Sequence, residues 1–332
     1  MAVYTDVSDE DLLAFLTEYN IGEVVSFKGI AEGVENTNYL LQTLTPDSDA
    51  PRSYILTLYE KRVHREDLPY FLGLMDHLAE NGISCPTPIH GRDGAALRQL
   101  AGRPAAIVSF LSGIWPKKST PKHCAELGTA LARLHEAGQS FEGHRPNNMS
   151  VAGWRTLVAE TRDQADEVVP GLRDMLDAEL AEISDYWPDD LPTGVIHADL
   201  FPDNVFFLGD RLSGLIDFYF ACNDALAYDL AICINAWCFE PDNSLNVTKA
   251  RALLRGYAAI RPLTRPEFDA LPRLARGGAL RFLLTRLYDW VNHDTAAFVQ
   301  PKDPRQFLGR LRFHQQVDGP SAYGVDFGDV GA

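Results

Sequence analysis

A short segment in the second half of the chain carries side chains whose types and spacing suit phosphoryl transfer. In VIHADLFPDNVFF, residues 195–207, His197, Asp199 and Asn204 follow the pattern H-x-D-x-x-x-x-N, and Asp217 comes soon after in LIDF. Transfer from ATP needs one carboxylate that orients the acceptor hydroxyl and takes its proton, and an Asn and a second Asp that hold Mg²⁺. We therefore predict that Asp199 is the catalytic base and that Asn204 and Asp217 are metal ligands. His197 is predicted to hold the loop.

The elements around this segment must bring these side chains together. Apolar stretches at 194–197, 205–208 and 212–217 predict one short strand before the loop and a strand pair after it. A strand–loop–strand unit of this length can hold Asp199, Asn204 and Asp217 around one volume. The alternative interpretation is an Asp/Asn turn in a hairpin with no catalytic role, because the bare pattern also arises by chance.

The chain changes from strand-like to helix-like patterns along its length. A helix is predicted to begin at Ser8, and strands are predicted at 24–30, 38–43, 52–59, 95–100 and 104–110, with a helix at 66–81. Helical spacing follows from Thr120 and then at about 151–184, 225–239, 246–261, 266–298 and 303–315. This order predicts an α+β, two-lobed, protein-kinase-like fold, with a small antiparallel β-rich N-terminal lobe and a larger, mainly helical C-terminal lobe. The predicted boundaries are 1–108 for a nucleotide-binding lobe, 109–116 for a hinge linker and 117–332 for a catalytic and substrate-binding lobe.

The net charge limits the kinds of binding partner, and the cysteine content indicates the redox state of the thiols. The 332 residues include 30 Lys and Arg against 46 Asp and Glu, a formal charge of −16, which disfavours nucleic acid and anionic lipid as partners. The start of the chain lacks the pattern of a signal peptide. The sequence also contains no apolar run long enough to predict a membrane-spanning helix. We expect a cytoplasmic enzyme for a small molecule, as a monomer or homodimer. The five cysteines, without a C-x-x-C pair, predict reduced thiols: Cys85, Cys124, Cys222, Cys233 and Cys238.

Several segments resemble a known superfamily. HADLFPDN followed by LIDF resembles the catalytic and metal-binding loops of the aminoglycoside phosphotransferase and choline kinase superfamily. Asp217 runs into FYFACNDALAYDLAICINAW without an A-P-E, which disfavours a protein kinase because no activation segment fits there. GIAEGVENTNYLL, YILTLYE, LARLHEAG and the WCF stretch together resemble the homoserine kinases of this type. The resemblance implies ATP and Mg²⁺, and phosphorylation of L-homoserine to O-phospho-L-homoserine in threonine biosynthesis.

The predicted nucleotide site lies in the first lobe. Gly29 and Gly33 bracket a loop between two strands, where backbone N–H groups can approach phosphates; an ordinary hairpin that needs glycines is the alternative. By resemblance, the linker from Ser109 to Leu111 bonds the edge of adenine. Alignment of YILTLYE with the third strand of kinases places Thr57 where they have a phosphate-gripping Lys.

The missing lysine keeps a second function open. Lys28, Lys61 or Arg62 are candidate sources of the positive charge that Thr57 cannot supply. If none supplies it, the chain is a nucleotide-binding pseudokinase. The complete set of Asp199, Asn204 and Asp217 opposes that interpretation. Choline, aminoglycoside, methylthioribose or fructosamine kinases are the alternatives within the superfamily.

A substrate that is a small amino acid needs a carboxylate for its ammonium group and a cation for its carboxylate. Asp224 and Asp229 follow the metal-binding strand and are predicted to carry the ammonium contact. Tyr219, Trp237 and Arg286 are further candidates for the pocket wall. The alternatives are helix core for Trp237 and a structural ion pair for Arg286.

Overall fold

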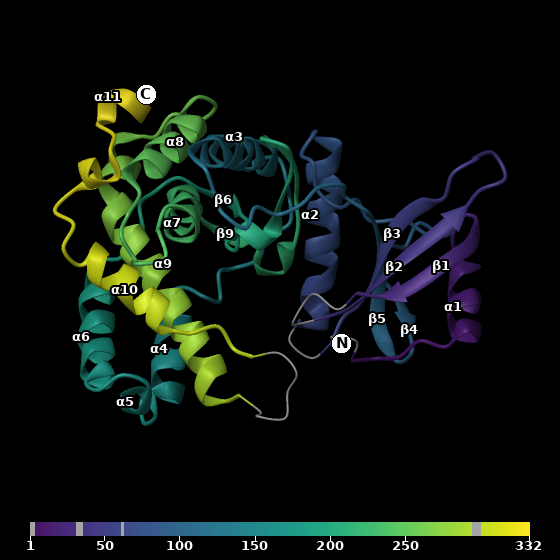
Figure 1. The fold of residues 1–332 in the computed structure, drawn as a ribbon, viewed down its shortest axis with the longest axis horizontal. Coiled ribbons are helices and arrows are strands. Elements are labelled where there is room, and N and C mark those ends of the chain that lie inside the picture. Colours follow the sequence, from purple (N-terminus) through teal and green to yellow (C-terminus); the bar gives the residue numbers. More distant parts are fainter. Residues whose placement is uncertain (1–3, 31–35, 61–62, 294–299) are drawn as a thin grey trace. The chain divides into compact units, whose positions relative to one another are not determined.

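The computed structural model describes residues 4–30, 36–60, 63–293 and 300–332, and the chain divides into two compact units, residues 1–112 and 113–332 (Figure 1). The division falls inside the predicted linker, 109–116. Gly33, Lys61 and Arg62 lie outside the described residues, so their predicted roles have no structural counterpart here. Each unit is described by itself.

The first unit is a five-stranded sheet with two α-helices. Its strands are β1 (Glu23–Gly29), β2 (Thr37–Leu44), β3 (Arg52–Leu58), β4 (Arg98–Leu100) and β5 (Arg103–Ser109). They pair antiparallel in the order β1-β2-β3-β5-β4. The helices are α1 (Asp9–Leu16) and α2 (Leu68–Glu80), the latter preceded by the 3₁₀ turn η1 (Arg65–Asp67). The antiparallel sheet and the helix inserted after its third strand confirm the fold class predicted for this part.

Alternating burial explains how this sheet gains its core. Along β2, residues at every second position are buried, as expected for a strand with one face against a core. Leu41, Leu56 and Ile107 from three neighbouring strands are fully buried in a cluster with Leu12 and Phe15 of α1. At the other helix, α2 ends before Gly82, whose φ of +80° is the left-handed conformation that glycine adopts without strain.

The second unit is mainly helical. Its α-helices are α3 (Pro121–Gly138), α4 (Val151–Thr161), α5 (Ala165–Val168), α6 (Leu172–Asp185), α7 (Leu226–Trp237), α8 (Val247–Ala258), α9 (Arg265–Val291), α10 (Arg305–His314) and α11 (Phe327–Val330). Short 3₁₀ turns are η2 (Pro202–Asn204), η3 (Phe218–Phe220) and η4 (Pro320–Tyr323). Two antiparallel pairs join β6 (Thr193–Ile196) to β9 (Cys222–Ala225) and β7 (Val205–Leu208) to β8 (Arg211–Leu215). None of the described helices is long and apolar enough to cross a bilayer.

Helix α7 lies at the centre of this unit, with α3 and α9 around it (Figure 1). Nearly all of its residues are buried, so its sequence shows no polar stripe. Two expectations differ from the structure. The predicted helical segment 151–184 is three helices, because Gly171 takes a φ of +79° just before α6. Strand β9 was not expected, and it pairs with the strand that precedes the catalytic loop.

Candidate active site

The loop between β6 and β7 holds two of the predicted residues in direct contact. The side-chain amide of Asn204 donates to the backbone oxygen of Asp199 at 2.8 Å and to its carboxylate at 3.1 Å. The backbone N–H of Ile216 donates to the carbonyl of Asn204 at 3.0 Å, which ties the loop to the end of β8. Because the nitrogen of the Asn204 amide faces Asp199, its oxygen is left to face another ligand.

Asp217 completes the predicted set. It has φ 65° and ψ 67°, a left-handed conformation that is costly for a residue with a Cβ and that clusters at functional sites. Burial, and next the charge of Asp217, raise the pKa of Asp199 well above its usual range; Arg281 and Lys302 oppose this rise. The structure thus brings the three predicted polar side chains to one end of the two strand pairs.

His197 lies where a loop-holding residue is expected. Its ring is fully buried, with Nε2 3.0 Å from the carbonyl oxygen of Ile216 and Nδ1 3.3 Å from the backbone nitrogen of Asp199. An N–H must donate to the carbonyl, so we assign the proton to Nε2 and the acceptor role to Nδ1. Burial lowers the pKa of His197 to about 4, and the neutral ring that this favours suits both hydrogen bonds.

Asp229 lies behind the loop and not in a substrate pocket. Its carboxylate is fully buried and accepts the backbone N–H of His197 at 2.7 Å and that of Ala198 at 2.9 Å. The Nε2 atom of His135 lies 3.3 Å away. The carboxylate has neither exposed surface nor a free position for an ammonium group, so the predicted substrate contact of Asp229 is wrong.

Trp237 requires a similar correction. Its side chain is 1% exposed, and its indole N–H donates to the carbonyl oxygen of Leu200 at 2.7 Å. A side chain without exposed surface cannot form a pocket wall. Trp237 therefore supports the catalytic loop from within the core, which is the alternative that the sequence left open.

The sequence alone did not place a fully buried cation beside the loop. Arg281 of α9 donates from Nη1 to the carbonyl oxygen of Ala198 at 2.7 Å and lies over the rings of Phe220 and Phe282. Among the described residues, no carboxylate forms an ion pair with it. Since Ala198 has a positive φ of 63°, the hydrogen bond from Arg281 helps to hold the loop in a strained conformation. No local sequence signal places α9 here.

Three further residues that were predicted at the substrate site are partly exposed to solvent. Asp224 in β9 is half-buried and accepts from the amide of Asn147 at 2.6 Å. Tyr219 is half-buried in η3. Arg286 of α9 is also half-buried and donates to the side-chain oxygen of Gln306 at 2.7 Å. Their roles at a substrate stay predictions.

In the first unit, Gly29, Thr57 and Ser109 of the predicted nucleotide site lie on three strands of the one sheet, of which β3 and β5 are neighbours. Gly29 ends β1 and is exposed. Thr57 in β3 is buried, and its hydroxyl donates to Asn38 Oδ1 at 2.8 Å across the strand pair. Ser109 ends β5, and its backbone N–H donates to the carbonyl oxygen of Thr87 at 2.9 Å. Its N–H is therefore committed within the unit. Leu111 follows in the half-buried linker.

The oxygen donors near Asp199 fit a hard cation. Among the described residues, no group of three His, Cys, Asp or Glu side chains forms a metal site. The Asp217 carboxylate and the Asn204 amide oxygen are the two predicted protein donors. This set suits Mg²⁺, which binds through one or two protein oxygens and keeps its remaining positions for water and phosphate.

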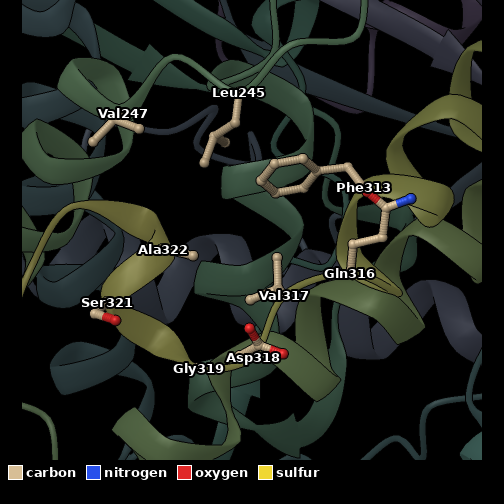
Figure 2. Close-up of a pocket in the computed structure, with 9 residues that line it drawn as sticks. All are labelled: Leu245, Val247, Phe313, Gln316, Val317, Asp318, Gly319, Ser321 and Ala322. Atoms are coloured by element: carbon tan, nitrogen blue, oxygen red, sulfur yellow. The ribbon is translucent and has the colours of Figure 1, made fainter.

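A hollow elsewhere in the second unit has a different lining. It encloses about 480 Å³ between α8, α10 and η4 and is lined by Leu245, Val247, Phe313 and Ala322 among others (Figure 2). None of the residues that contact the catalytic loop lines it, and its one carboxylate is Asp318. The loop between β6 and β7 is therefore the candidate active site.

Fold and site together define a two-lobed phosphotransferase that acts on a hydroxyl group. A sequence model described as "Phosphotransferase enzyme family" matches residues 26–263. Homoserine kinases of Xanthobacter autotrophicus and Parvibaculum lavamentivorans are 62% and 63% identical to this chain; each match covers 98% of the chain and 99% or 100% of the relative. The chain belongs to the homoserine kinases of the phosphotransferase enzyme family.

Solved structures support the same fold at low sequence identity. A microcompartment-associated aminopropanol kinase is 18% identical with a TM-score of 0.63, covering 96% of this chain and 100% of its own. A choline kinase from Cryptosporidium parvum is 13% identical with a TM-score of 0.65, covering 93% and 95%. At these identities the likeness shows the fold alone. It agrees with the predicted protein-kinase-like architecture.

Proposed function

We propose that this enzyme transfers the γ-phosphoryl group of ATP to the side-chain hydroxyl of L-homoserine, giving ADP and O-phospho-L-homoserine. The observation that carries the proposal is identity of about 60% to relatives named homoserine kinase over nearly the whole chain. The contact between Asp199 and Asn204 in the catalytic loop supplies the chemistry that such a transfer needs.

Asp199 acts as the base in the proposed reaction. Asn204 fixes one carboxylate oxygen of Asp199, which leaves the other to accept the proton of the substrate hydroxyl. The proton moves from the hydroxyl to Asp199 as the oxygen bonds to phosphorus and the bond from phosphorus to ADP breaks.

Asn204 and Asp217 are proposed to hold Mg²⁺. When bound, the ion neutralises charge on the phosphates of ATP. The amide oxygen of Asn204 and the carboxylate of Asp217 would be its protein ligands. Their backbones are coupled, since Ile216 donates to the carbonyl of Asn204. The loop and the end of β8 therefore move together, which keeps the two ligands in register.

The first unit is proposed to bind the nucleotide. The exposed end of β1 at Gly29 is the place for backbone contact with phosphates. Ser109 can offer adenine its carbonyl oxygen only, because its N–H is committed to Thr87, and Leu111 would supply the N–H. Thr57 bonds Asn38 and carries no charge, so the phosphates must be neutralised by another group.

On the substrate side, Asp224 and Tyr219 remain the proposed contacts for the ammonium group and the pocket wall. Asp224 keeps a half-buried carboxylate on β9, the strand that pairs with the one leading into the catalytic loop. We further propose that the product serves threonine biosynthesis in the cytoplasm. The five cysteines, all buried and all free thiols, agree with a reducing compartment.

The test is a coupled assay of ADP release with purified enzyme, ATP and Mg²⁺. L-Homoserine, choline, kanamycin and methylthioribose are compared at equal concentrations, and the phosphorylated product is identified by mass spectrometry. We expect kcat/KM for L-homoserine to exceed that of each other compound by at least tenfold. A higher value for choline or kanamycin would keep the phosphotransferase class and reject the proposed substrate. ATP binding without turnover of any compound would favour the pseudokinase.

A further inference from the structure

A pair of cations beside the catalytic loop has no part in the mechanism described so far. Arg286 lies near the C-terminal end of α9, and Lys302 lies shortly before α10. The ammonium group of Lys302 is 3.2 Å from the carboxylate of Asp203, the neighbour of Asn204 in the loop. Phe201, which directly precedes η2, packs against Phe282 of α9 and Phe307 of α10, so the segments that carry the two cations lie next to the loop.

Both cations pack against the faces of aromatic rings. The ring of Phe201, two residues after the base, lies 4.7 Å from that of Phe282 and 6.1 Å from that of Phe307. The guanidinium of Arg286 lies 4.5 Å above the centre of the Phe307 ring, and the ammonium of Lys302 lies 5.7 Å above that of Phe201. The catalytic loop and the two cations thus contact the same cluster of phenylalanine rings.

The guanidinium of Arg286 is held in place on one side. Its Nη1 atom donates to the side-chain oxygen of Gln306 at 2.7 Å and lies 3.4 Å from the backbone oxygen of Asp303. Both partners are neutral. The remaining N–H groups of a guanidinium form a planar fork that matches a carboxylate. A preformed fork of this kind binds an anion at a smaller entropic cost than a freely rotating side chain.

Among the described residues, no Asp or Glu side chain forms an ion pair with the guanidinium of Arg286. The exposed Arg305 nearby, by contrast, pairs with Asp303 at 2.9 Å. Burial lowers the pKa of Arg286 to about 10, although the charges of Asp203, Asp199 and Asp303 act in the opposite direction. A partly desolvated cation without a carboxylate partner is destabilised until an anion binds.

We infer that Arg286 is the residue that binds the α-carboxylate of the substrate. The inference rests on the proposed function, because it requires an amino acid as substrate. In L-homoserine a short aliphatic chain separates the carboxylate from the hydroxyl that is phosphorylated. A carboxylate on Arg286 would therefore lie beside the loop that carries Asp199, because Phe307, under the guanidinium of Arg286, packs against Phe201 of that loop. Alcohols that lack a carboxylate cannot form this bidentate contact, so they should be poorer substrates than L-homoserine.

The experiment compares two substrates in two variants. L-Homoserine and 3-aminopropan-1-ol, its analogue without the carboxylate, are assayed with the wild type, Arg286→Gln and the control Arg305→Gln. We expect Arg286→Gln to lower kcat/KM for L-homoserine roughly 10- to 100-fold and to change kcat/KM for the amino alcohol less than about threefold. Arg286→Lys should recover part of the loss, because it restores charge without the fork. Arg305→Gln should leave both values near those of the wild type.

Each outcome separates this inference from the proposed function. Equal losses for both substrates, or no loss for L-homoserine, would overturn the role of Arg286 while leaving the reaction intact. A wild type that is inactive on L-homoserine would overturn the proposed function and this inference with it. If turnover of the amino alcohol is slow, calorimetric binding of both compounds in the presence of ADP and Mg²⁺ gives the same comparison. Thermal unfolding of each variant excludes loss of fold as the cause.

Discussion

Asp229 accepts the backbone N–H of His197 at 2.7 Å, so a helix from the core holds the residue that opens the catalytic loop. The other oxygen of Asp229 accepts from Ala198 at 2.9 Å, and His135, itself 2.8 Å from the hydroxyl of Tyr257, completes the contacts. Burial by itself raises the pKa of Asp229, but the hydrogen bond and charge of His135, together with the backbone N–H of His197, bring it below the usual range. The buried carboxylate is therefore ionised and ties α7 to the loop.

Asp229→Asn is expected to destabilise the protein and to slow catalysis. The amide nitrogen would face one of the two backbone N–H donors, leaving buried donors unpaired at a cost of about 1–3 kcal/mol or more. The loop would lose its fixed position, so kcat should fall although Asp229 does not contact the substrate. Urea unfolding and steady-state kinetics measure both effects. The exposed Asp210→Asn serves as control, and unchanged stability in Asp229→Asn would contradict the anchoring role.

Asp199→Asn tests the base. The substitution keeps the shape and the neighbourhood of Asn204 but removes the proton acceptor. We expect kcat to fall by roughly 10²–10⁴, with little change in affinity for the nucleotide. Rapid-quench measurement of the chemical step, with calorimetry for ATP, gives the two quantities. Retention of kcat close to that of the wild type would remove Asp199 from the proposed mechanism.

Asp217→Asn tests the metal site through the nucleotide. Because the carboxylate would act through the ion, the variant should lose most of its turnover and should weaken binding of Mg·ATP more than binding of metal-free ATP. Calorimetric titration with and without Mg²⁺ gives the ratio of the two losses. The same loss in both titrations would place Asp217 outside the metal site.

The local patterns of the chain were sufficient to predict the loop between β6 and β7 and the short strands around it. The spacing of Asp199, Asn204 and Asp217 fixes them at the ends of short adjacent strands, and the strands themselves are local features. Thr120 likewise marked a helix start correctly, since it acts through the hydrogen bond of its own side chain to the first turn. The two-lobed α+β fold followed from the order of such elements.

The roles of Asp229 and Trp237 were not predictable in the same way. Both belong to α7, which is buried on all sides, so the sequence has no polar stripe to show which residues face the loop. Proximity along the chain to Asp217 suggested a substrate contact for Asp229, whereas tertiary packing turned its side chain toward backbone N–H groups. Arg281 depends on the placement of α9, which no local pattern encodes.

Close packing of α3 against α8 gives a prediction about stability. A Cβ atom on Gly128 would overlap the carbonyl oxygen of Leu253, and one on Gly256 would overlap that of Ala125. The obstacles are backbone atoms, which cannot rotate away, so the helices must separate. We expect Gly128→Ala to lower the free energy of unfolding by about 1–3 kcal/mol or more. Gly328→Ala, where a Cβ meets open space, is the matched control and should change stability by less than about 1 kcal/mol.

The buried His314 predicts sensitivity to acid. Its ring nitrogens lie 2.9 Å from the hydroxyl of Tyr323 and 3.2 Å from Asn235 Oδ1, and burial, assisted by the charge of Arg310, lowers its pKa to about 3. In the unfolded chain a histidine titrates near 6.5. As pH falls, the unfolded state therefore takes up the histidine proton at a higher pH than the folded state does. The free energy of unfolding decreases as pH falls below about 6.5 toward 3. Between pH 7 and pH 5, protonation of this one histidine should lower the free energy of unfolding by about 2 kcal/mol.

The variant His314→Gln, whose side chain can still donate and accept hydrogen bonds, tests this assignment. Its free energy of unfolding should fall by about 2 kcal/mol less over that interval than that of the wild type, as measured by urea unfolding at both pH values. The exposed His144→Gln should behave as the wild type, and an equal pH dependence in His314→Gln would contradict the assignment.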